Sequence, residues 1–94
     1  MTLSELFHPD VTTHKAQLAT VVLPLSMAAA GQALRLVEIH AGHELTHRLA
    51  ELGLTRGVEV KVVQDAGGPL LISVRGSRIA IGRGMAHKLL VAPV

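Results

Sequence analysis

The pentapeptide His43-Glu44-Leu45-Thr46-His47 is the one stretch of this sequence whose residue types and spacing match a known catalytic chemistry. Histidines four positions apart lie on the same side of a helix and can together chelate a zinc ion. A glutamate directly after the first histidine can act as general base on a zinc-bound water. With a third ligand, the pentapeptide would support metal-assisted hydrolysis.

The surroundings of the pentapeptide argue against catalysis. A catalytic zinc usually takes three protein ligands, and no later histidine has a spacing that would supply the third. The carboxylates downstream, Glu51, Glu59 and Asp65, lie in the same expected helix or in and just after the next expected strand. No second helix is expected to bring a ligand across a cleft. With six histidines and seven acidic residues in 94, a chance match is ordinary.

A surface-bound metal is the weaker alternative for the same residues. His43, His47 and Glu44 could hold a divalent ion such as zinc or iron without chemistry. The competing interpretation is that these are solvated positions, because the histidines fall outside the apolar stripe of their helix. The pattern favours solvated positions, so we predict no catalytic residue and no required cofactor.

The element that carries the pentapeptide is predicted to be a helix from about His43 to Leu52. Leu45, Leu49 and Leu52 recur at spacings of four and three, which makes one apolar stripe. Gly53 follows the last periodic residue, where a left-handed C-terminal cap needs no Cβ. Leu54, directly after it, can then fold back onto the helix.

The rest of the chain is predicted to be strand and turn. Alternating apolar residues indicate strands in which one face is buried. Gly76-Ser77 has the turn chemistry of a tight hairpin, and residues 83–88 form one helical turn. The strands are expected over residues 21–25, 33–39, 58–62, 70–74, 79–81 and 89–91. We therefore predict a mainly β fold: a small, partly open barrel of five to six strands with one short helix over residues 20–94, preceded by an N-terminal extension over residues 1–19.

Composition narrows the class further. The sequence is 49% hydrophobic with no Trp, no Tyr and one Phe, so the core must be aliphatic. The absence of Cys excludes disulfides and thiolate metal sites. A net charge of +2 and the lack of stacking aromatics argue against nucleic-acid binding. Residues 18–30 are apolar, but they follow a net negative segment and are too short to span a bilayer, so we expect neither secretion nor membrane insertion.

Basic residues gather around the predicted C-terminal hairpin and the helical turn after it. They could bind an acidic partner, or they could form an ordinary solvated strand face. The residues are Arg75, Arg78, Arg83 and Lys88.

Three stretches together carry a resemblance to a known family. Residues 23–37 contain Leu-Pro-Leu, a glycine and Leu-Arg-Leu-Val. Residues 48–57 read R-L-x-x-L-G-L-x-x-G, and residues 76–81 read G-x-x-I-A-I. In this combination, over about residues 21–92, the chain resembles the ferrous iron transport protein A (FeoA) family. Two features depart from that pattern: Arg56 stands where the family usually has Pro, and residues 1–19 have no clear counterpart.

The resemblance implies an SH3-like barrel in the bacterial cytoplasm that supports ferrous iron uptake. The implied partner is the cytoplasmic part of the membrane transporter FeoB, which carries a GTPase domain. The resemblance leaves open an alternative, a metal-responsive interaction module like the C-terminal domain of iron-dependent repressors. The sequence also leaves open a homodimer. The docking surface is expected at the helix and its exit, where plain core packing is the competing role for the leucines. The residues concerned are Arg48, Leu49, Leu52, Gly53 and Leu54.

Overall fold

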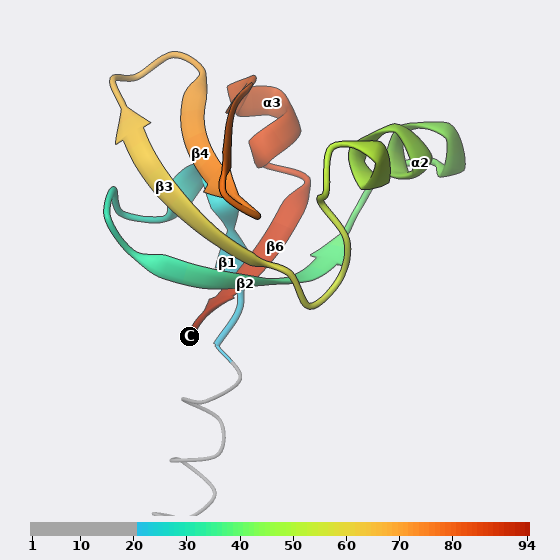
Figure 1. Ribbon diagram of the computed structural model, residues 1–94, viewed down its shortest axis with the longest axis horizontal. Helices are drawn as coiled ribbons and strands as arrows, with labels where there is room; N and C mark the ends of the chain where they lie inside the picture. Colours follow the sequence, from blue (N-terminus) through green and yellow to red (C-terminus); the bar gives the residue numbers. More distant parts are fainter. Residues whose placement is uncertain (1–20) are drawn as a thin grey trace, which may run out of the picture.

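A computed structural model of the protein describes residues 21–94. The predicted extension over residues 1–19 lies outside this part of the chain. Six strands form one antiparallel sheet in the order β1-β6-β2-β3-β4-β5, which curls around a core (Figure 1). The elements are β1 (Leu23–Pro24), the 3₁₀ helix η1 (Leu25–Met27), β2 (Ala33–Ile39), α2 (His43–Glu51), β3 (Glu59–Asp65), β4 (Leu70–Val74), β5 (Ser77–Ile81), α3 (Arg83–Ala86) and β6 (Leu89–Pro93).

The mainly β prediction is confirmed, and the barrel is open. β1 and β5 are the two ends of the strand order and do not pair with each other. α2 lies to one side of the barrel, between β2 and β3 in the chain (Figure 1). No helix within residues 21–94 is both long and apolar enough to cross a membrane.

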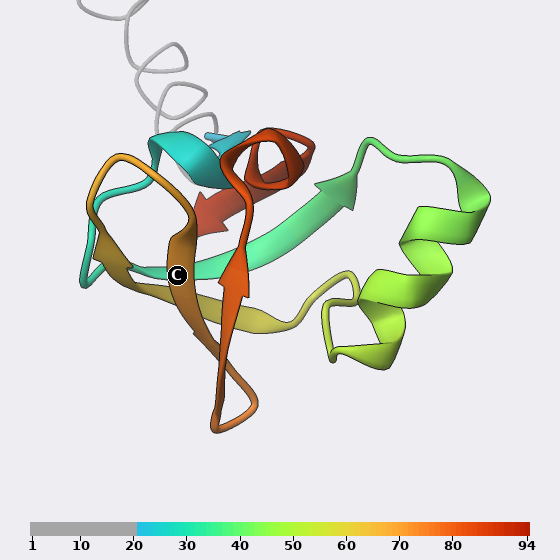
Figure 2. The same cartoon turned by 90° about the horizontal axis from the view of Figure 1, so that it is seen from above.

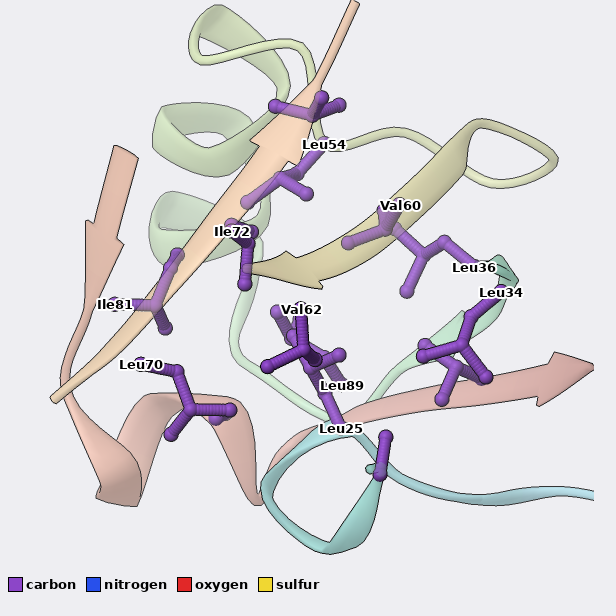
Figure 3. Close-up of a cluster of buried hydrophobic side chains, with 14 of the residues drawn as sticks. Leu25, Leu34, Leu36, Leu54, Val60, Val62, Leu70, Ile72, Ile81 and Leu89 are labelled. Atoms are coloured by element: carbon purple, nitrogen blue, oxygen red, sulfur yellow. The ribbon is translucent and has the colours of Figure 1, made fainter. Parts of the chain in front are cut away.

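The core is aliphatic, as the composition requires. Side chains from several strands and from η1 point toward one another in Figure 3. Every buried residue among 21–94 is Leu, Ile, Val or Ala, and no polar side chain is buried there. Alternation holds best in β4, where Leu70, Ile72 and Val74 are buried and the residues between them are half-buried. Because side chains of a strand alternate between its two faces, this pattern determines which face of β4 packs against the core.

β2 departs from simple alternation. Leu34 and Leu36 are buried as expected, but the register with β6 shifts between Leu36 and Glu38. One extra residue in a strand reverses the faces of all later residues. Glu38 therefore points to solvent, and Ile39, which alternation places on the outer face, packs against the core instead.

The hairpin between β4 and β5 is tight, but its turn begins one residue earlier than predicted. Val74 pairs with Ser77, so the two loop residues are Arg75 and Gly76 rather than Gly76 and Ser77. Both have positive φ, 51° and 79°, which is the type I′ conformation that matches strand twist. The first strand is also shorter than expected, because η1 begins directly after Pro24.

Candidate docking site

The C-terminal end of α2 is closed by backbone hydrogen bonds. The Leu54 N–H donates to the Leu49 carbonyl at 3.0 Å, and the Gly53 N–H donates to the Ala50 carbonyl at 2.9 Å. Gly53 has φ +93°. These two hydrogen bonds, together with the left-handed conformation of Gly53, form a Schellman motif. The predicted glycine cap and the return of Leu54 are therefore confirmed.

The apolar stripe of α2 divides into buried and exposed parts. Leu49 is 3% exposed and Leu54 is fully buried, so both belong to the core. Leu45 is half-buried and packs against the core. Leu52 is 52% exposed. Direct contact with a partner would therefore fall to Leu52, while Leu49 and Leu54 hold the helix in place.

A groove lies between α2 and the far edge of the sheet. Its volume is about 280 Å³, and its walls are mostly apolar. Figure 2 shows α2 facing β5, with α3 at the end of β5. Leu45, Arg48, Leu49 and Leu52 line one wall, and Ala80, Ile81, Gly82 and Met85 line the other. Arg48 is exposed and gives this groove a cationic rim.

The groove's second wall was not foreseen from the sequence. Ile81 and Met85 come from β5 and α3, at least thirty residues after the end of α2, and only the fold brings them opposite the helix. No local signal marks this wall, because the predicted strand series continues to residues 89–91 and only the folded sheet order makes β5 an edge strand. The Arg75 side chain, from the β4–β5 turn, lies close to the helix exit. A Cβ on Gly53 would be 3.4 Å from the Arg75 Cδ.

The histidine pentapeptide lies at the start of α2. His43, Glu44 and His47 are exposed. Across residues 21–94, no three His, Cys, Asp or Glu side chains are gathered closely enough to hold a metal ion. The nearby His40 pairs instead with Glu38, Nε2 to Oε2 at 3.1 Å. Metal binding by the two histidines of the helix stays a prediction that calorimetric titration with zinc or ferrous iron can test.

The basic residues predicted around the hairpin have different environments. Arg83 is half-buried; it forms an ion pair with Asp65 and donates to the Ser26 carbonyl at 3.1 Å. The Gly67 N–H and the Arg83 guanidinium hold the pKa of the Asp65 carboxyl below its usual value. This network ties the end of β3 to η1 and α3. Arg75 and Arg78, by contrast, are exposed on the hairpin.

Comparison with known proteins agrees with the geometry. The family model of the FeoA domain matches residues 23–93. An Fe(2+) transport protein A of Methanocaldococcus jannaschii is 41% identical over 68 residues, 72% of this chain and 83% of that protein. The crystal structure of an iron uptake regulatory protein (FeoA) is 37% identical, with a TM-score of 0.74 over 79% of this chain and all of that one. The solution structure of the FeoA protein from Chlorobium tepidum is 27% identical, with a TM-score of 0.71 over 77% of this chain and 70% of that one.

The same fold occurs in a manganese-dependent transcriptional repressor. That structure, in complex with manganese, has a TM-score of 0.72 at 16% identity, and this chain covers 37% of it. At that identity the likeness shows the fold alone. The family model, the relative at 41% identity and the shared SH3-like fold together establish that this chain is a member of the FeoA family, whose named relatives are Fe(2+) transport proteins.

Proposed function

We propose that this protein is a non-enzymatic cytoplasmic accessory protein for ferrous iron uptake, and that it docks on the cytoplasmic part of the FeoB transporter. The observation that carries the proposal is the groove between α2 and β5–α3, with the half-exposed Leu52 on its wall. An apolar groove with a charged rim is a surface suited to another protein. Three of its residues, Arg48, Leu49 and Leu52, belong to the docking surface expected from the sequence.

A docking role agrees with the chemistry of the site. The groove is lined by leucine, isoleucine, methionine and alanine side chains, with Arg48 as its charged residue. Leucine and methionine walls bind by burying apolar area and do not activate a nucleophile or move a proton. The exposed face of α2 with His43 and His47 points away from this groove. Binding, not turnover, is therefore the activity that the groove supports.

The test is a binding titration with the purified cytoplasmic part of the transporter from the same cell. Arg48→Glu reverses the charge at the groove rim without entering the core, and we expect it to weaken binding about tenfold or more. Arg56→Glu is the matched control, because it makes the same charge change on an exposed residue after α2 that does not line the groove. Absence of binding by the well-folded wild type would refute the proposal. Equal loss in both variants would place the contact elsewhere.

A further inference from the structure

The outer edge of β5 offers unpaired backbone groups to a partner. The type I′ turn makes Val74 and Ser77 a hydrogen-bonded pair, and such pairs alternate along an antiparallel ladder. Ile79 and Ile81 therefore bond to β4, whereas the N–H and C=O groups of Arg78 and Ala80 point away from it. Within residues 21–94, no strand covers this edge and neither residue has a backbone partner there.

This open edge borders the docking groove. Ala80 and Ile81 form part of one wall, and the leucines of α2 form the other. Both cartoon views place β5 between β4 and α2 (Figures 1 and 2). A chain segment that paired with Arg78 and Ala80 would therefore lie in the groove. Its side chains would alternate between the groove and solvent, because successive residues of a strand point to opposite faces.

A second copy of this chain does not fit the groove well through the same edge. Ile81 is buried in its own barrel and Ile79 is half-buried against the core. The outward side chains of β5, those of Arg78 and Ala80, offer one cation and one methyl group. If the β5 strands of two copies paired with each other, no large apolar side chain would cover the groove wall around Leu52. The occupant must bring apolar side chains of its own.

The charge around the edge specifies the occupant further. Arg78 pairs with Ser73 across the hairpin, and Ser73 pairs with Lys61 on β3. The side chains of Lys61, Ser73 and Arg78 therefore form a row across the outer face of the sheet. Lys61 and Arg78 are its two cations, and Arg78 lies at the β5 edge. Arg48 adds a cation at the groove rim. A carboxylate opposite Arg78 on an added strand would form a favourable cross-strand pair.

We propose that β5 receives an extended segment of the partner protein as an added antiparallel or parallel strand, with apolar residues alternating into the groove and an acidic residue opposite Arg78. This inference rests on the proposed docking function and specifies its mode. Main-chain hydrogen bonds to Arg78 and Ala80 give affinity, and the groove selects the side chains, as in other cases of strand addition.

The experiment compares two substitutions at one position. Ala80→Pro removes the outward N–H, and because Ala80 and Leu71 form a non-hydrogen-bonded pair, the ladder to β4 is preserved. Ala80→Ser keeps that N–H and is the matched control. We expect the proline variant to bind the purified cytoplasmic part of the transporter about tenfold more weakly. The serine variant should remain within about twofold of wild type.

Amide hydrogen exchange on the wild type gives a second test that needs no variant to fold. The amides of Arg78 and Ala80 should exchange fast in the free protein and at least about tenfold more slowly in the complex. The Ile79 amide, bonded to β4, should be slow in both. Binding without protection, or a folded Ala80→Pro variant with wild-type affinity, would overturn strand addition and leave groove docking standing. If the Arg78 and Ala80 amides exchanged more slowly as the concentration of this protein alone increased, a second copy would occupy the edge, and the inference would be overturned. Failure of the wild type to bind would instead refute the docking function itself.

Discussion

Leu49 in α2 and Leu52 at its C-terminal cap should respond differently to the same substitution, one mainly in stability and the other mainly in binding. Leu49 is 3% exposed and Leu52 is 52% exposed. Truncating a buried leucine to alanine removes its transfer free energy and leaves a cavity, at a cost of about 2–5 kcal/mol. Full burial of a leucine side chain is worth about 1.5–3 kcal/mol. Since half of Leu52 is already in water, its truncation should cost at most about 1 kcal/mol.

Thermal unfolding measures this difference directly. For a domain of this size, 1 kcal/mol corresponds to about 4–8 °C in Tm. We therefore expect Leu49→Ala to lower Tm by about 10–25 °C and Leu52→Ala by less than about 8 °C. Binding to the transporter's cytoplasmic part should show the reverse order for folded protein. Leu52→Ala should weaken it about tenfold, because it removes apolar surface on the groove wall that the partner would bury, worth about 1.4 kcal/mol.

Two results would refute this reasoning. If Leu52→Ala unfolded the protein as strongly as Leu49→Ala, Leu52 would be a core residue and not a docking residue. If the folded Leu52→Ala variant bound the transporter like wild type, the groove wall would not be the contact surface. A circular dichroism spectrum at the binding temperature separates loss of binding from loss of fold.

Further predictions concern the helix cap, the hairpin, the Asp65 ion pair and the metal hypothesis. Gly53→Ala should lower the free energy of unfolding by about 1–2 kcal/mol, because φ is +93°; Gly57→Ala, at φ +89° with nothing within 4 Å of the added Cβ, should lose about the same amount. No loss at either position would contradict this reasoning. Arg75→Asn should raise stability by about 0.5–1 kcal/mol in denaturant unfolding, since Asn tolerates positive φ in a type I′ turn, and a fall would mean that arginine packing matters more. The lowered pKa of Asp65 in the folded state stabilises the protein above the unfolded value of about 4 and ceases to do so as pH falls through the folded value; Asp65→Asn should therefore flatten the fall of Tm with acid, and an unchanged slope would contradict this. Zinc titrated onto the histidine pair of α2 should change transporter affinity by less than about twofold in the same binding assay; a larger change would couple the two sites.

Local patterns in the sequence predicted most of the fold because here they agree with the packing. β4 alternates without interruption, and the α2 stripe ends at a glycine that adopts the conformation its cap requires. Prediction failed where a single residue changes the register. The bulge after Leu36 reverses the faces of β2, and the turn at Arg75 places a non-glycine residue at positive φ. The residues before the bulge and before the turn keep the ordinary alternation of a strand. Hydrophobic periodicity therefore cannot predict either feature.

The candidate site was predictable only in part, for a related reason. Arg48, Leu49 and Leu52 line one wall of the groove together with Leu45, and the expected docking surface already included the first three. The second wall requires β5 to end the sheet and α3 to follow it, which is long-range information that no local pattern holds. The sequence also does not show which leucine is exposed. Leu49 is covered by the core, whereas Leu52, three residues later, extends beyond the core into solvent.

The position of the pentapeptide on α2 explains why the most recognisable motif and the proposed docking site need not be connected. A helix advances about 100° per residue. His43 and His47 therefore lie on one side of α2, while Leu45, Leu49 and Leu52 lie about 120–180° away from His43, on the other side, where the groove is. Neither histidine lines the groove, so an ion held by them could influence docking only through its charge beside the exposed Arg48 or by changing the helix backbone. The Schellman cap and the buried Leu49 already hold that backbone at its far end. Docking through the groove is thus expected to proceed with or without a metal on the histidine face.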